Sequence, residues 1–110
     1  MTYRVIITPT AAQDLRIATA YIRRDSPIAA RRWLKQIKAH IATLSRLPER
    51  RRLAAEASSF NEPIRELLFG SGNRGTYRIL FILIEVRVEV LHVRHGSMLP
   101  LGAAPDDDDG

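Results

Sequence analysis

The sequence predicts an α+β domain in which a helical hairpin packs on one face of a mostly antiparallel sheet. Two patterns support this fold class. Apolar residues recur every three or four positions between residues 11 and 44, as on amphipathic helices. Between residues 64 and 93 they form short β-branched stretches, which are typical of strands. With one more β-branched segment at residues 3–8, the expected order is strand, helix, helix and three strands.

The two helices are predicted from their apolar stripes and their start signals. Thr8 and Pro9 offer a helix start, because proline is accepted in the first turn. Ser26 is the expected N-cap of the second helix, and Pro27 is its first residue. Both stripes keep helical spacing, so the helices can pack as an antiparallel hairpin, and Pro48 ends the second one. The stripes comprise Ala11, Leu15, Ala18 and Ile22, then Ala30, Leu34, Ile37, Ile41 and Leu44.

The second half is predicted to supply three strands. Residues 48–63 lose the periodicity and are expected to form a connecting loop, with a possible helical turn at 53–57. Strands follow at 64–69, 76–84 and 86–93, joined by a glycine-rich hairpin loop and a tight connection at Glu85. The middle strand is apolar on both faces, so we expect it to lie in the centre of the sheet.

Length and composition indicate one small domain, residues 1–98, followed by a tail, residues 99–110. The chain has no cysteine, which excludes disulfides and thiolate metal sites, and no apolar run long enough to span a membrane. We therefore expect a soluble, cytoplasmic protein without metal or cofactor.

The net charge suggests a polyanionic partner. It is +5 overall, but four acidic residues form the run Asp106 to Asp109, and the remainder carries 17 basic and eight acidic side chains. Such a body attracts nucleic acid or acidic protein segments. The acidic run itself is either a solvated end or a segment that folds back on the basic face as a weak decoy.

Three arginines lie inside or at the end of segments that otherwise predict buried strands: Arg65, Arg78 and Arg94. A guanidinium cannot remain unpaired in a core, so either acidic neighbours pair with it or it lines an exposed positive face. Arg65 could pair across strands with Glu89 or Glu85, whereas Arg78 has few obvious partners in its own strand. His92 is expected to be a hydrogen-bonded structural residue, His40 to lie on the surface or in helix packing, and Trp33 to lie in the core or in a groove for a partner segment.

The order of these motifs resembles the RelE/ParE superfamily of bacterial toxins over residues 2–98. The C-terminal part of the resemblance lies in Ile64 to Leu67, Gly70, Thr76 to Phe81 and Val90 to Gly96. The N-terminal part lies in Tyr3 to Val5, Ala11 to Leu15, Tyr21 and Ile22, Ala29 to Trp33, Leu44, and Leu47 with Pro48.

The resemblance implies a type II toxin that a cognate antitoxin holds inactive. The first hypothesis is ribosome-dependent cleavage of mRNA without a metal, which requires a proton acceptor, a proton donor and cations at the developing charge. The family pattern would place catalysis at Arg65, Arg78, Arg94 and His95, with His95 as general acid because histidine titrates near neutrality. RNA binding would then fall to Arg50, Arg51, Arg52 and Arg74.

Two alternatives remain open. The first is inhibition of DNA gyrase without nuclease activity, as in the ParE branch, favoured by the His-Gly ending of the last strand and by the missing lysine pair before the second strand. The second is a basic nucleic-acid-binding module unrelated to toxins, against which the 6% aromatic content argues because stacking platforms are scarce.

Overall fold

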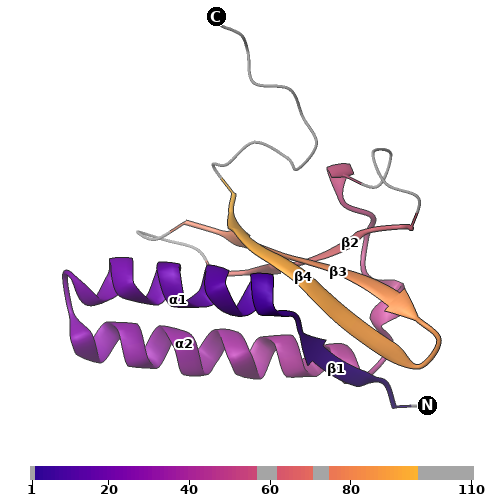
Figure 1. Cartoon of the computed structure of the whole chain (residues 1–110), viewed down its shortest axis with the longest axis horizontal. Coiled ribbons are helices and arrows are strands. Elements are labelled where there is room, and N and C mark those ends of the chain that lie inside the picture. Colours follow the sequence, from indigo (N-terminus) through magenta and orange to yellow (C-terminus); the bar gives the residue numbers. More distant parts are fainter. Residues whose placement is uncertain (1, 57–61, 71–74, 97–110) are drawn as a thin grey trace, which may run out of the picture.

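The computed structural model describes residues 2–56, 62–70 and 75–96. It confirms the predicted α+β fold and the predicted order of elements (Figure 1). The elements are β1 (Arg4–Ile7), α1 (Pro9–Arg23), α2 (Pro27–Ala42), β2 (Arg65–Phe69), β3 (Tyr77–Ile84) and β4 (Arg87–His95), with short 3-10 turns at Thr43–Ser45 and Pro48–Arg50.

Both helices start where their capping residues predict. Thr8 Oγ1 accepts a hydrogen bond from the Ala11 amide at 3.3 Å, and Ser26 Oγ accepts one from the Ala29 amide at 3.1 Å. A proline follows each cap at the first helical position, where its missing N–H costs no hydrogen bond. The two helices lie side by side as one layer against the sheet (Figure 1).

The sheet is mixed, with strand order β1-β4-β3-β2. β1 runs parallel to β4, while β3 pairs antiparallel with both β4 and β2. β3 is therefore an inner strand, as its two apolar faces predicted. A register shift between Leu80 and Phe81 marks a bulge in the β3–β4 pairing, and the tight turn before β4 holds Glu85 in the left-handed region at φ 56°.

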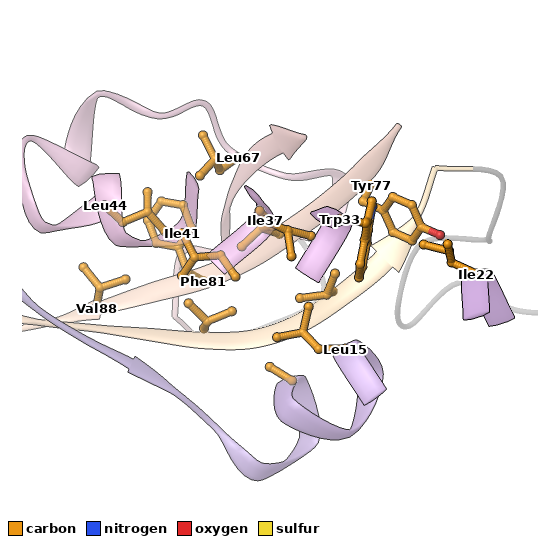
Figure 2. Packing of buried hydrophobic residues seen from close by; sticks show 14 of the residues in the cluster. Leu15, Ile22, Trp33, Ile37, Ile41, Leu44, Leu67, Tyr77, Phe81 and Val88 are labelled. Atoms are coloured by element: carbon orange, nitrogen blue, oxygen red, sulfur yellow. The ribbon is translucent and has the colours of Figure 1, made fainter. Parts of the chain in front are cut away.

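The main core lies between the helices and one face of the sheet (Figure 2). Phe81 and Ile79 of β3 are fully buried there against Ile37 of α2. Trp33 is buried in the same layer, with its ring 5.0 Å from that of Tyr77, so the core position predicted for it is confirmed. The opposite face, which we call the open face, carries a smaller cluster of Ala54, Ile64 and Leu80.

The segment between α2 and β2 differs from the simple loop that was predicted. Its residues 52–54 run beside the outer edge of β2: the Ala54 amide donates to Ile64 O at 2.8 Å, and the Glu66 amide donates to Arg52 O at 3.0 Å. Ala55 and Glu56 form a helical turn, while residue 57, at the end of the predicted turn, lies outside the described residues. Among the residues described, neither helix has the length and apolar character that a bilayer crossing requires.

Candidate functional site

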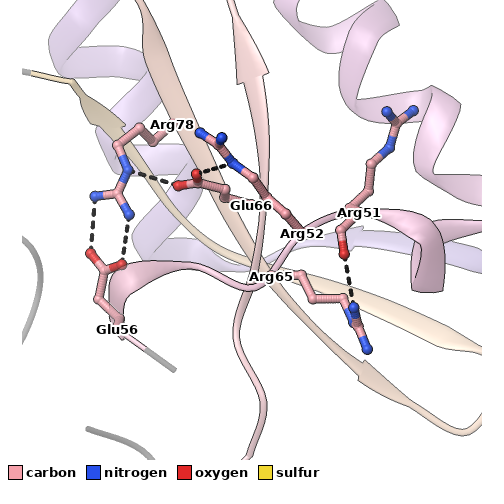
Figure 3. A network of polar contacts seen from close by, with 6 residues as sticks. All are labelled: Arg51, Arg52, Glu56, Arg65, Glu66 and Arg78. Carbon is pink, nitrogen blue, oxygen red and sulfur yellow. Dashed lines mark hydrogen bonds and ion pairs between the residues drawn. The ribbon is translucent and has the colours of Figure 1, made fainter. Parts of the chain in front are cut away.

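Arg78 lies on the open face at the centre of an ion-pair network (Figure 3). Its Nη1 and Nη2 donate to the two carboxylate oxygens of Glu56 at 3.0 and 2.6 Å, and its Nε donates to Glu66 Oε1 at 2.9 Å. Glu66 Oε2 also accepts from Arg52 Nε at 2.6 Å. The partners that the sequence did not reveal for Arg78 thus come from β2 and from the segment before it.

The Arg78–Glu56 pair of this network is buried and holds Arg78 as a cation. The side chain of Arg78 is 13% exposed, and that of Glu56 is 0% exposed. The hydrogen bonding of Arg78 to the Glu56 carboxylate raises the pKa of Arg78 above its ordinary value, with burial opposing this effect and Glu66 adding to it. Since every guanidinium nitrogen of Arg78 donates to a carboxylate, an arriving phosphate would meet charge that is already neutralised.

Arg65 occupies a different place from Arg78. The strand register pairs it with Phe81, and therefore puts it on the helix-covered face, whereas Glu66 and Arg78 belong to the open face. Its Nη1 donates to the backbone oxygen of Arg51 at 2.8 Å. The predicted pairing with Glu89 or Glu85 is wrong, because β3 separates β2 from β4. Glu89 instead accepts from Arg87 Nε at 2.8 Å.

Arg94 and His95 point to opposite faces at the end of β4. Arg94 is opposite Arg78 in the register, on the open face, and His95 is opposite Tyr77 on the helix-covered face. The His95 ring packs edge-on against the Tyr77 ring with centroids 5.1 Å apart. The four residues expected to form a catalytic set are therefore divided in pairs between the two faces of the sheet.

Of the residues expected to bind RNA, Arg50 and Arg51 are exposed beside a shallow hollow that His40 also lines. His40 Nε2 lies 2.9 Å from Leu68 O, so a proton on this nitrogen would donate to the edge of β2. Arg52 forms an ion pair with Glu66 through its Nε. Arg74 and the acidic run Asp106 to Asp109 lie outside the described residues.

His92 is hydrogen-bonded, as predicted. Its Nδ1 lies 3.3 Å from Asp14 Oδ2, and the same oxygen accepts the Val93 amide at 2.9 Å. Asp14 thus joins α1 to β4. Within the described part of the chain, no cluster of three potential metal ligands is present.

Sequence reasoning missed a groove between α1 and the end of β4, with a volume of about 460 Å³. We call it the α1–β4 groove; its lining includes Ile17, Tyr21, Tyr77, Val93, Arg94 and His95. Ile17 and Tyr21 are 60% and 67% exposed, so two large apolar side chains lie together at this groove and are open to a partner. Their spacing of four residues, off the core stripe of α1, was the signal that could have revealed it.

Comparisons with known proteins agree with this architecture. The profile of the family described as "ParE toxin of type II toxin-antitoxin system, parDE" matches residues 5–100. A chain of the solved structure "Chromosomal ParDE TA system from P. aeruginosa" is similar with a TM-score of 0.66 and 17% identity, over 86% of this chain and 96% of that one. At this identity the likeness concerns the fold. No curated protein matches. Because the family profile spans nearly the whole domain, the chain belongs to the ParE toxin family of type II toxin–antitoxin systems.

Proposed function

We propose that the protein inhibits growth by binding DNA gyrase, with no bond cleavage of its own. The observation that carries this proposal is the state of Arg78, whose guanidinium is fully engaged by Glu56 and Glu66. A nuclease would need that cation at the developing negative charge of the phosphate.

The division of the other residues supports the same proposal. General acid–base catalysis needs the donor, the acceptor and the stabilising cations around one reacting group. Arg65 and His95 share the helix-covered face, while Arg78 and Arg94 share the open face. Binding can use a wide surface and so could use both pairs at once, which supports this proposal.

Ribosome-dependent mRNA cleavage is the second candidate. One observation favours it: Arg94 and His95 both line the α1–β4 groove, so a guanidinium and an imidazole lie close together there. The exposed Arg50 and Arg51 could supply additional contacts to RNA phosphates.

The family implies a cognate antitoxin, and the α1–β4 groove suits an amphipathic segment of that partner. Ile17 and Tyr21 would be buried by such a segment, as interface anchors usually are. Ile28 at the start of α2 and Leu68 on β2 are separate exposed apolar side chains that an antitoxin could also cover.

The test is induced expression in a bacterial host without antitoxin, followed within minutes by separate pulse-labelling of new DNA and new protein. We expect DNA synthesis to fail first, with intact mRNA, and the Arg94→Ala/His95→Ala variant to leave mRNA intact as well. Early loss of protein synthesis with cleaved mRNA, abolished in that variant, would establish the second candidate instead.

A further inference from the structure

The helical layer carries two rows of exposed cations. Arg16 and Arg23 are seven residues apart on α1, so they lie on one side of that helix. Arg31, Lys35 and Lys38 follow one another at spacings of four and three on α2, and they also share one side. All five side chains belong to exposed residues.

A groove lies between the two helices, and three of the five cations line it. A hollow of about 470 Å³ between the helices is lined by Arg16 and Arg23 from α1 and by Lys38 from α2. We call it the α1–α2 groove. Its other lining residues, such as Leu15 and Leu34, form the floor between the rows. The groove lies on a different side of α1 from the α1–β4 groove, since Ile17 and Tyr21 do not line it.

The charge of these rows is not neutralised within the described residues. Arg16 donates twice to the neutral amide oxygen of Gln13, at 3.0 and 2.8 Å, and none of the five cations forms an ion pair in that part of the chain. α2 contains no aspartate or glutamate, and the one acid within α1, Asp14, is bound to β4. By contrast, Arg52, Arg78 and Arg87 are paired with glutamates on or near the sheet.

The α1–α2 groove contains no large exposed apolar side chain among the described residues. In its floor Leu15 is 3% exposed and Thr19 is 6% exposed, and the remaining apolar area comes from smaller or half-buried side chains such as Ala20 and Leu34. The large exposed apolar side chains of the described residues lie elsewhere, on the other side of α1, in the first turn of α2, on β2 and in the loops and turns. The exposed cations at the rim therefore favour an anionic occupant.

A nucleic-acid duplex fits such a surface better than a single strand. Proteins that bind single strands usually offer aromatic rings on which bases stack. Here Trp33 is buried in the core, and Tyr21 faces the α1–β4 groove. A duplex presents its phosphates outward, with one charge per about 3.4 Å along each strand, so the span of about 10 Å from Arg31 to Lys38 matches about three phosphates.

The geometry points to a second binding surface: the α1–α2 groove holds the phosphate backbone of a DNA duplex between Arg16 and Arg23 of α1 and Lys38 of α2, with Arg31 and Lys35 adding contacts along α2. The choice of DNA over an RNA duplex rests on the proposed function, because gyrase acts on duplex DNA. The toxin would then contact both the enzyme and the DNA that the enzyme holds.

The direct test is fluorescence anisotropy of a labelled 20-base-pair DNA duplex titrated with the full-length protein over a series of salt concentrations. If all five cations contact phosphates, the slope of log K against log salt should be about −4.5.

The variant Arg16→Gln/Arg23→Gln/Lys38→Gln should reduce that slope to about −2, since each lost contact removes about 0.9. The matched control, Arg4→Gln/Arg32→Gln/Arg46→Gln, removes the same charge from other exposed positions and should keep the slope of the unmodified protein. Circular dichroism of each variant checks its fold.

Three outcomes would overturn the inference. The first is an equal loss of slope in both triple variants, which would mean that only net charge matters. The second is tighter binding of an RNA duplex or of single strands than of the DNA duplex. The third is no DNA binding by a protein that still inhibits supercoiling by purified gyrase, a result that leaves the proposed function intact. Conversely, DNA binding at the α1–α2 groove without inhibition of gyrase would support this inference and contradict the proposed function.

Discussion

At the scale of single residues, the main feature of the molecule is a buried pair of charges. From the sequence, Arg78 had few obvious partners in its own strand. Glu56 is fully buried, and its two oxygens accept from Arg78, which is 22 positions away in the sequence. A carboxylate in that position is tolerated because it is paired and hydrogen-bonded. The pair also fixes the segment before β2 onto the open face.

Replacing Arg78 with methionine should therefore destabilise the fold strongly. The change leaves Glu56 as a buried charge without its bidentate partner, and breaking such a pair costs about 3–5 kcal/mol. Urea unfolding followed by circular dichroism measures the loss. Arg52→Met is the control, because Arg52 is 64% exposed and its ion pair with Glu66 should contribute only about 0–1 kcal/mol.

A double variant separates the cost of an orphaned charge from the value of the pair. Glu56→Leu/Arg78→Met removes both charges, and its stability should return towards that of the unmodified protein, since apolar replacements of buried pairs are often neutral. An Arg78→Met protein as stable as the unmodified one would show that the network does not support the fold.

Tyr3 provides a prediction about alkaline pH. Its hydroxyl donates to Glu49 Oε2 at 2.8 Å, and this hydrogen bond, with smaller effects of burial and of the Glu49 charge, raises the pKa of Tyr3. Because the pKa is higher in the folded state, the stabilisation is complete below the unfolded pKa of about 10 and is lost as the pH rises through the folded value.

The titration is followed by tyrosinate absorbance, which reports the three tyrosines of the chain together. In Glu49→Ala, one of the three should ionise at lower pH than in the unmodified protein. Superimposable titration curves for the two proteins would contradict the assignment of this hydrogen bond.

At the scale of elements, α1 completes the sheet as well as covering it. β1 pairs with β4 as far as Val90, and Thr8 then donates through its hydroxyl to Val90 O at 2.7 Å. Six residues after Thr8, Asp14 Oδ2 accepts a hydrogen bond from the Val93 amide at 2.9 Å. The first half of α1 thus satisfies an edge of β4 that has no neighbouring strand at that point.

Asp14→Ala should loosen this connection. The amide of Val93, a buried residue, loses its acceptor, which should lower the free energy of unfolding by about 1–3 kcal/mol. The Val93 amide should also exchange its hydrogen faster, which NMR measures residue by residue. Asp25→Ala, at an exposed position in the turn after α1, removes the same charge and should change neither quantity appreciably.

Unchanged exchange at Val93 in Asp14→Ala would mean that the amide finds another acceptor, and that the link between α1 and β4 depends on packing alone.

At the scale of the whole molecule, the order of elements followed from the sequence because each element is determined by local signals. Helical spacing, the caps Thr8 and Ser26, and the two apolar faces of residues 76–84 are all properties of short segments. The arrangement of the sheet did not follow in the same way. Placing β1 parallel beside β4 depends on contacts between the two ends of the chain. The strand order also separates β2 from β4, and without that order the partner of Arg65 could not be identified.

The candidate site was harder to predict than the fold for the same reason. Arginines at the expected positions are present, but their chemistry depends on carboxylates brought from elsewhere. Glu56 belongs to a segment without periodicity, so no pattern marked it as a buried partner. Similarly, Ile17 and Tyr21 were identifiable only after the core side of α1 was known.

α1 has two candidate binding sides as well as its core side. One side presents Ile17 and Tyr21 to the α1–β4 groove, where apolar burial would hold the antitoxin. The other presents Arg16 and Arg23 to the α1–α2 groove, where electrostatic attraction would hold DNA. Since these forces and surfaces differ, substitutions should separate the two activities.

Ile17→Ser/Tyr21→Ser should weaken antitoxin binding without changing the charge of the protein. Burying a large apolar side chain contributes about 1.5–3 kcal/mol, so each substitution should lower the affinity about tenfold or more. The variant should keep the salt-dependent binding of duplex DNA. Growth rescue by co-expressed antitoxin, together with calorimetry of the purified pair, measures the first effect.

The variant Arg16→Gln/Arg23→Gln/Lys38→Gln should show the reverse pattern, with antitoxin binding retained and DNA binding reduced. If each variant lost both activities, the two sides of α1 would form one continuous interface, and an antitoxin bound there would exclude DNA directly.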